Sequence, residues 1–332
     1  MAGISGLGTT FNLPNYTGVL YGLTPADTPF FSAIGGLTGG EETFTKDFEW
    51  SFYDLRDASA TAQRLEGADA PTSEERVRSN ADNVTEIHQE TVGVSYTKLA
   101  ATAQKNGLNN EAPNNVKNEL DWQTTQMLKQ MVRDIEVTFL SGTYAKPANN
   151  STARRTRGIL EAITTNVADA ATVDLFTNDE TNDRAANLRE LILDLMQDAW
   201  ANGGLQEGET ATLMTNATGK RRLTEAFVRG EGYQETSRSV GGVNVQTIET
   251  DFGTLNLMLN RHLPADQLLV VSLEECAPVF LNIPGKGHFF AEPLAKTGAN
   301  EKVMFYGEVG LRYGDERKHA KVINIDWAAA PA

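Results

Sequence analysis

The chain has 332 residues, of which 40% are hydrophobic and 22% are charged, so it can bury a sizeable core and wholesale disorder is excluded. Its 44 acidic and 29 basic residues give a net charge of −15, which argues against a protein that condenses nucleic acid by neutralising phosphates. Cys276 is the only cysteine, so no disulfide can form within the chain, and we expect a small buried apolar side chain there.

Residues 1 to 40 are rich in glycine and carry widely spaced aromatic side chains. This pattern predicts an extended arm, and such an arm cannot bury its aromatic side chains within itself. They therefore have to lie against the body of the protein or against a neighbouring chain, with an apolar anchor over residues 29 to 34. The aromatic residues of the arm that we expect at contacts between subunits are Phe11, Tyr16, Tyr21, Phe30 and Phe31.

Large apolar side chains alternate from Phe44 to Phe52, which predicts a half-buried strand. Alternation returns at Val92 and Val94, so we predict the return strand of a hairpin over residues 84 to 99. The polar residues 56 to 82 between them predict a projecting tip, because compact domains seldom hold long loops without structure. Contacts between subunits are expected in this hairpin at Trp50, Arg64, Glu66 and Arg76.

The pattern becomes helical after about residue 112. Apolar residues recur three or four apart, and no Gly or Pro interrupts residues 114 to 141, so we predict one helix over that range. At ~1.5 Å per residue it measures about 40 Å, which exceeds the usual globular helix. A basic loop follows, in which Arg154, Arg155 and Arg157 face either solvent or the carboxylates of a neighbouring subunit.

A second amphipathic helix is predicted from about Asp183 to Asn202, and a short capped helix begins at Asn216. The final segment, residues 301 to 326, has apolar alternation on both sides of a turn at Gly314 and predicts a hairpin. Short strands are predicted at residues 210–215, 243–248, 254–259 and 268–272. These elements together predict an α+β fold with parts that extend outward.

A search for catalytic and metal-binding motifs finds no complete one. The four histidines and the cysteine have no zinc-binding spacing. Gly219-Lys220 lacks the rest of a phosphate loop, and residues 251–253 (DFG) lack every other kinase motif and fit a hairpin turn. We therefore predict no metal, no cofactor and no enzymatic activity. A hydrolase with an unrecognised acid pair is the remaining catalytic alternative.

The first residues contain neither the basic segment nor the long apolar run of a signal peptide. No run of about 18 apolar residues occurs, so we expect no membrane span and synthesis in the cytoplasm. The extended parts expose surface that one subunit cannot bury, which favours a symmetric assembly of identical copies.

The order of these parts resembles the tailed-bacteriophage major capsid proteins with the Hong Kong 97 fold, most closely a siphophage branch. Sequence segments similar to those of the family occur at residues 24–35 (TPADTPFFSAIG), 48–70 (FEWSFYDLRDASATAQRLEGADA), 92–97 (VGVSYT), 127–142 (MLKQMVRDIEVTFLSG) and 153–160 (ARRTRGIL). The resemblance covers essentially the whole chain and is strongest through residue 160.

The resemblance implies an assignment of parts. Residues 1–40 form an N-arm, 41–98 an extended E-loop that lies over a neighbouring subunit, 99–204 a peripheral domain with the spine helix 114–141, 205–270 an axial domain, and 271–332 a return to the peripheral domain with the terminal hairpin. It also implies that copies assemble as hexamers and pentamers into the icosahedral shell of the virion. The shell would enclose double-stranded DNA without reading its sequence, and an acidic chain suits that role.

Portal, scaffold and decoration proteins are the further partners that the resemblance implies, and a membrane is not among them. Nothing in the sequence marks a covalent crosslink between subunits. The alternative within the same class is another phage structural protein, such as a tail-tube or decoration protein. Tail-tube subunits are generally smaller and dominated by β structure, so a helix of about 40 Å disfavours that alternative.

Overall fold

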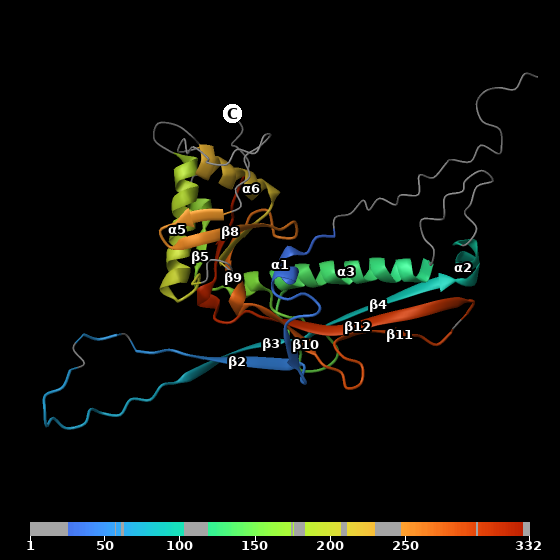
Figure 1. Ribbon diagram of the computed structural model, residues 1–332, viewed down its shortest axis with the longest axis horizontal. Helices are drawn as coiled ribbons and strands as arrows, with labels where there is room; N and C mark the ends of the chain where they lie inside the picture. Colours follow the sequence, from blue (N-terminus) through green and yellow to red (C-terminus); the bar gives the residue numbers. More distant parts are fainter. Residues whose placement is uncertain are drawn as a thin grey trace, which may run out of the picture.

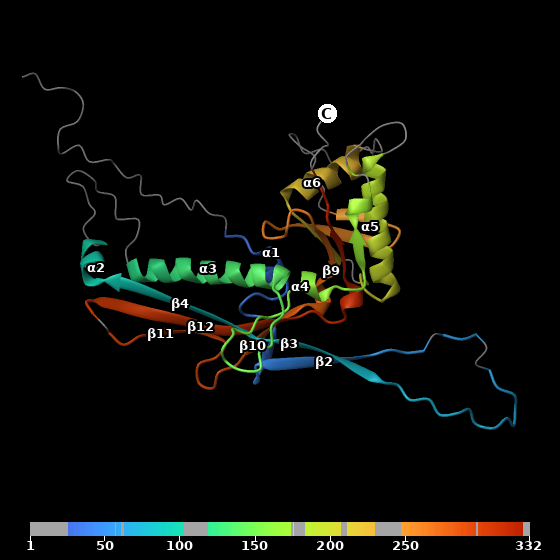
Figure 2. The same cartoon turned by 180° about the vertical axis from the view of Figure 1, so that it is seen from behind.

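The computed structural model describes residues 26–56, 58–60, 63–102, 119–173, 175, 183–206, 211–229, 247–296 and 298–327. A five-stranded sheet lies along the longest helix, and a six-stranded sheet lies at one end of that helix (Figure 1). A two-stranded ribbon projects from the same end, away from the rest of the molecule, as the reverse view also shows (Figure 2). The predicted α+β class is confirmed.

The five-stranded sheet is built around β12 (Asn300–Arg312), a strand of 13 residues. One edge of β12 pairs antiparallel with β4 (Glu86–Ser95). The other edge pairs with β11 (Phe289–Pro293) and then with β10 (Ala277–Leu281). The short strand β1 (Glu41–Thr43) runs parallel to β10 and completes the sheet.

The longest helix, α3 (Glu119–Ser141), lies over this sheet (Figure 1). Its apolar stripe is buried at Met131, Ile135 and Phe139, as the 3- to 4-residue spacing requires. The predicted end at Ser141 is confirmed, and residues 114–118 of the prediction lie outside the described residues. A short helix, α2 (Tyr96–Thr102), follows β4.

The projecting ribbon consists of β2 (Asp47–Tyr53) and β3 (Arg78–Val84), which pair antiparallel and are joined by residues 54–77. The predicted return strand over residues 84–99 is therefore wrong, because most of that segment forms β4 in the five-stranded sheet. Strand β3 reads RSNADNV and is exposed over its first half, so it carries no apolar alternation that a sequence pattern can detect.

The six-stranded sheet separates two cores. Its order is β5 (Val167–Asp169), β13 (Ala320–Ile323), β9 (Leu268–Ser272), β6 (Ala211–Thr215), β8 (Gly253–Leu259) and β7 (Thr247–Thr250). Along β9, Leu268 and Val270 pack in one core, whereas Leu269 and Val271 pack in the core that contains the end of α3. The strands predicted at 210–215, 254–259 and 268–272 are confirmed within one residue. Residues 243–246 lie outside the described residues, and β7 contains the rest of that prediction.

The terminal hairpin predicted for residues 301–326 is wrong. Strand β12 belongs to the five-stranded sheet, whereas β13 pairs with β9 and β5 in the six-stranded sheet. Both segments are apolar on a buried face, but apolar periodicity reports burial and does not identify the pairing partner. Residues 313–319 thus connect the two sheets.

Helix α5 (Arg184–Ala201) covers one face of the six-stranded sheet, with the predicted stripe buried. The Asp183 carboxylate caps this helix by accepting from the amides of Ala185 and Ala186 at 2.9 and 3.2 Å. Helix α6 (Ala217–Thr224) begins at the predicted cap, Asn216, and continues as a π-helical turn, η2 (Glu225–Arg229). The remaining helices are α1 (Pro29–Ala33), α4 (Ile159–Ala162), η1 (Ala170–Thr172), η3 (Leu273–Glu275) and η4 (Glu316–Lys318). Among the helices in these ranges, none combines the length and the apolar character that crossing a membrane requires.

Candidate assembly surfaces

The N-terminal anchor is packed inside the subunit. Phe30 and Phe31 are 0% and 1% exposed, and the Phe31 ring meets Phe139 of α3 edge-on with centroids 5.6 Å apart. This corrects the expectation that a neighbouring subunit covers these two rings, because the chain's own core already covers them. Phe11, Tyr16 and Tyr21, the other aromatic residues expected at contacts, lie outside the described residues.

A buried carboxylate holds this anchor in place. Glu136 of α3 accepts hydrogen bonds from the amides of Phe30 and Phe31 at 3.0 and 2.6 Å and from the side chain of Asn260 at 2.6 Å. Burial raises the pKa of Glu136, and the three donors oppose that shift. Glu136 thus joins α1, α3 and the loop after β8. The sequence gives one faint signal for it, a charge within an otherwise apolar stripe.

The root of the ribbon is fixed to the end of β12. The indole nitrogen of Trp50 donates to the carbonyl oxygen of Gly314 at 2.8 Å, and the indole ring meets Tyr313 edge-on at 4.9 Å. Beside it, the Phe48 ring lies so close to Gly310 that a Cβ there would come within 2.6 Å of a ring carbon. Trp50, predicted as a contact between subunits, is therefore half-buried in its own chain.

Asn83 of β3 provides a second attachment. Its amide nitrogen donates to the carbonyl oxygen of Leu311 at 2.7 Å, and its side-chain oxygen accepts from the amide of Arg157 at 2.8 Å. The residue is completely buried, and these bonds satisfy both ends of its amide group. The ribbon root is consequently bonded both to β12 and to the loop after α3.

The three arginines of that loop have different environments. The Arg157 guanidinium donates to the Tyr313 hydroxyl at 3.0 Å and lies 4.2 Å above the Tyr144 ring. Arg154 pairs with the buried carboxylate of Glu308 and donates to a backbone carbonyl at 2.6 Å. Arg155 is exposed. Of the three, Arg155 therefore has the weakest attachment within the subunit: it forms no ion pair within 4.0 Å in the described residues, and its charge acts on Glu86.

The Tyr144 hydroxyl donates to the Asp82 carboxylate at 2.7 Å. Burial, together with this hydrogen bond and the charge of Asp82, raises the pKa of Tyr144 to about 12. The ammonium of Lys146 lies 3.6 Å from Asp47 and 3.8 Å from Asp82. These contacts link Asp47 and Asp82 of the ribbon root to the loop that follows α3.

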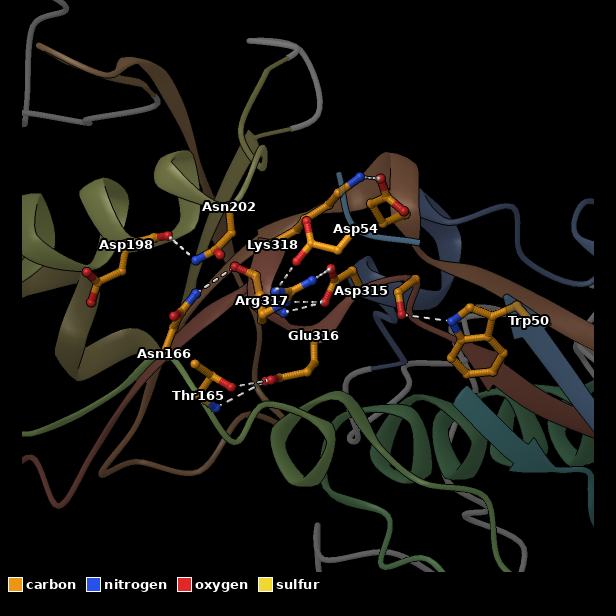
Figure 3. Close-up of polar contacts among 12 residues, drawn as sticks. Trp50, Asp54, Thr165, Asn166, Asp198, Asn202, Asp315, Glu316, Arg317 and Lys318 are labelled. Atoms are coloured by element: carbon orange, nitrogen blue, oxygen red, sulfur yellow. Dashed lines mark hydrogen bonds and ion pairs between the residues drawn. The ribbon is translucent and has the colours of Figure 1, made fainter. Parts of the chain in front are cut away.

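The loop of residues 313–319 contacts the ribbon and both sheets (Figure 3). Besides the Trp50 bond, the guanidinium of Arg317 pairs with Asp315 at 2.9 Å and lies 4.0 Å from Asp54 at the outer end of β2. The Glu316 carboxylate accepts from the amides of Thr164 and Thr165 at 2.8 and 3.1 Å. One short loop thus connects three parts of the subunit.

The inner side of the same loop is completely buried at His319. Nδ1 of His319 accepts from the amide of Ser272 at 3.2 Å, so Nε2 carries the proton and donates to the carbonyl oxygen of Tyr313 at 2.7 Å. Burial lowers the pKa of His319, which is consistent with the neutral ring. The Asn166 side chain, visible in Figure 3, donates to the Arg317 carbonyl at 2.6 Å.

The ribbon tip, residues 54–77, is exposed at each of its described positions. Leu65 and Val77 are 85% and 77% exposed, which is unusual for large apolar side chains on a projecting segment. Three predicted contact residues, Arg64, Glu66 and Arg76, lie in this tip, and Arg76 pairs with a tip carboxylate at 3.1 Å. Their role between subunits stays a prediction.

An open hollow of about 660 Å³ lies beside the ribbon root. It is bounded by residues 46–47, the end of β3, the start of β4 and the loop of residues 146–155. In the described part of the chain, no group of three or more His, Cys, Asp or Glu side chains is arranged to hold a metal ion. Cys276 is buried, and burial raises the pKa of its thiol, so it is an inert apolar residue as expected.

Comparison with known proteins identifies a family. The family described as SU10 major capsid protein matches residues 3–326. The comparison with curated proteins finds no match.

Three solved structures illustrate the likeness of fold. The capsid asymmetric unit of cyanophage A-1(L) matches with a TM-score of 0.63 and 11% identity, over 97% of this chain and 99% of that chain. The capsid of Myoviridae phage XM1 matches with a TM-score of 0.59 and 14% identity, over 98% and 100%. The SrpI encapsulin complex of Synechococcus elongatus gives 0.54 and 10%, over 92% and 90%. At these identities the likeness concerns the fold.

Proposed function

Because this chain belongs to the SU10 major capsid protein family, we propose that its copies assemble as hexamers and pentamers into an icosahedral shell around double-stranded DNA. It is a structural capsid protein with a Hong Kong 97-like fold, as the sequence predicts. The protein is a component of the virion. A role without catalysis, synthesis in the host cytoplasm, and contacts with portal, scaffold and decoration proteins are parts of the proposal.

The ribbon supports assembly most directly. Its tip leaves Leu65 and Val77 in water, although burial of such a side chain stabilises a protein by about 1.5–3 kcal/mol. Its root, in contrast, is bonded tightly to β12 and to the loop of residues 313–319. A stiff root and an uncovered apolar tip are the properties of an element that a neighbouring copy covers.

We also propose which elements form the N-arm, the E-loop, the axial domain and the peripheral domain. The N-arm is residues 1–40, anchored by α1, and the E-loop that reaches a neighbour is the ribbon, residues 47–84. The axial domain comprises the six-stranded sheet with α5 and α6. It therefore starts near residue 167 instead of 205 and includes β13. The peripheral domain comprises α3 and the five-stranded sheet.

Electron microscopy and light scattering of the purified chain test the proposal. Megadalton icosahedral particles are the expected result, whereas rings or tubes would favour a tail-tube role. A chain that stays monomeric or dimeric at high concentration, with no particles in the lysate of its phage, would overturn the proposed shell.

A further inference from the structure

Resting on the proposed function, we propose that the acidic tip segment of one copy docks in the basic root hollow of the next copy. The root hollow is the open space of about 660 Å³ beside the ribbon root. The tip segment is residues 65–75, near the far end of the ribbon (Figure 1). Three observations carry the inference: the charge of the hollow, the charge of the tip, and the distance between them within one subunit.

The root hollow is basic in a strongly acidic chain. Four basic and two acidic side chains line it. Partners within the subunit neutralise the cations of Lys146 and Arg154. Lys46 and Arg155 are exposed and lie in no ion pair within 4.0 Å among the residues that the structure describes, although the charge of Arg155 acts on the neighbouring Glu86 carboxyl. Ile87, which is 45% exposed, adds apolar surface to the same hollow. A fitting occupant therefore carries carboxylates next to an apolar side chain.

The tip segment has this complementary chemistry. It contains four acidic residues and no basic one. Glu74 is paired with an arginine of the tip, whereas Glu66, Asp69 and Glu75 form no ion pair in the described ranges. The apolar member is Leu65, directly before Glu66 and 85% exposed. The tip segment thus has carboxylates next to an exposed leucine, which matches the basic and apolar lining of the hollow.

The tip cannot fill the hollow of its own subunit. The paired strand β2 has seven residues, which at ~3.3 Å each separate root and tip by more than 20 Å, and the tip continues outward from there (Figure 2). The occupant is therefore the tip of a second copy. Because tip and root are different surfaces, the contact is head to tail, and head-to-tail contacts close into a ring when the rotation permits. Hexamers and pentamers are such rings.

A cysteine pair tests the docking directly. Glu66→Cys and Arg155→Cys place one thiol on the tip segment and one at the hollow, both at exposed positions. After mild oxidation of assembled particles, we expect a ladder of covalent multimers on a denaturing gel, which a reductant collapses to monomer. Each single variant is a control, and so is Glu66→Cys combined with Gln197→Cys, which is exposed on α5.

A charge exchange provides a second readout. One variant reverses two charges at the hollow, Lys46→Glu with Arg155→Glu. Another reverses two charges on the tip, Glu66→Lys with Asp69→Lys. Either variant brings like charges together, and we expect its particle yield to fall about tenfold. All four substitutions in one chain restore opposite charges, and we expect most of the yield to return. Light scattering at low salt, where charge contacts are strongest, measures the yield.

The outcomes separate docking from the capsid function. Particles that give no ladder, or a charge exchange that lowers yield further, overturn the docking and leave the capsid function standing. An equally strong ladder from the Gln197→Cys control also overturns it, because the tip then has no fixed site. A wild-type chain that forms no particles contradicts the proposed function itself.

Discussion

Trp50 and Gly314 are joined by an indole-to-carbonyl hydrogen bond of 2.8 Å, although 264 positions separate them in the sequence. This bond attaches the projecting ribbon to the loop that connects the two sheets. The Tyr313 ring next to Gly314 meets the indole edge-on, so the attachment combines a polar and an aromatic contact.

Replacement of Trp50 should therefore weaken the subunit. Trp50→Ala removes both contacts, and we expect a loss of about 3 kcal/mol in the free energy of unfolding. Trp50→Phe keeps a ring but leaves the carbonyl without its donor, and a loss of about 1–2 kcal/mol is expected. Urea denaturation measures both values. The control Tyr53→Ala, at a position 66% exposed, should change stability by less than about 0.5 kcal/mol. Equal effects at both positions would contradict the attachment.

The buried Glu136 should prove equally important for the N-terminal anchor. Glu136→Gln keeps the shape of the side chain but turns one acceptor into a donor that faces backbone amides. We expect a loss of about 2 kcal/mol or more, because a buried amide then lacks its acceptor. We also expect faster proteolysis before residue 35. Glu190→Gln, at an exposed position of α5, is the matched control. A stability equal to that of the control would refute the capping role.

His88 makes the stability depend on pH. Burial lowers its pKa to about 4, from 6.5 in an unfolded chain. The unfolded state thus binds the proton more tightly, so the contribution of His88 is complete above pH 6.5 and is lost as the pH falls toward 4. The loss reaches up to about 3 kcal/mol. In His88→Gln this part of the acid dependence should disappear, as urea denaturation at pH 7 and pH 4 can measure. The same acid dependence in both proteins would disprove it.

Deletion of residues 1–22 should separate folding from assembly. The α1 anchor and its Glu136 partner remain in this variant, so we expect a folded subunit with an unchanged melting temperature. Assembly should fail or decrease strongly, because the arm carries aromatic residues expected between subunits. Circular dichroism reports the fold and electron microscopy the particles. Normal particles would show that this arm is dispensable.

Local signals in the sequence are sufficient to predict the elements around α5 and α6. Asp183 and Asn216 are caps whose side chains bond the first helical amides, and the apolar stripe of α5 is complete. Residues 268–271 of the strand over 268–272 are a continuous apolar run, and the strand is buried on both faces. Such features act over a few residues, so the sequence displays them directly.

Partners far apart in the sequence could not be predicted in this way. Strand β3 is polar, so nothing in its pattern marks it as the partner of β2. The hairpin predicted around a turn at Gly314 is wrong, because β12 and β13 pair with other strands. Likewise, the sequence predicts an apolar anchor over residues 29–34 but not what covers it, and only the contacts with α3 and the Glu136 carboxylate show that the chain covers Phe30 and Phe31 itself.

Thr85 is the only residue between β3 and β4, and it has a consequence for how force passes through the molecule. Its amide donates to the Lys46 carbonyl at 2.9 Å, and its hydroxyl donates to Glu308 at 3.2 Å, so the junction is clamped on both sides. The ribbon is therefore held firmly at its root, where Thr85 bonds it to the rest of the subunit. With the tip docked on the next copy as proposed, a pull on the tip would pass to β12 and through it to the rest of the subunit, and neighbouring copies would share the outward pressure on any one of them.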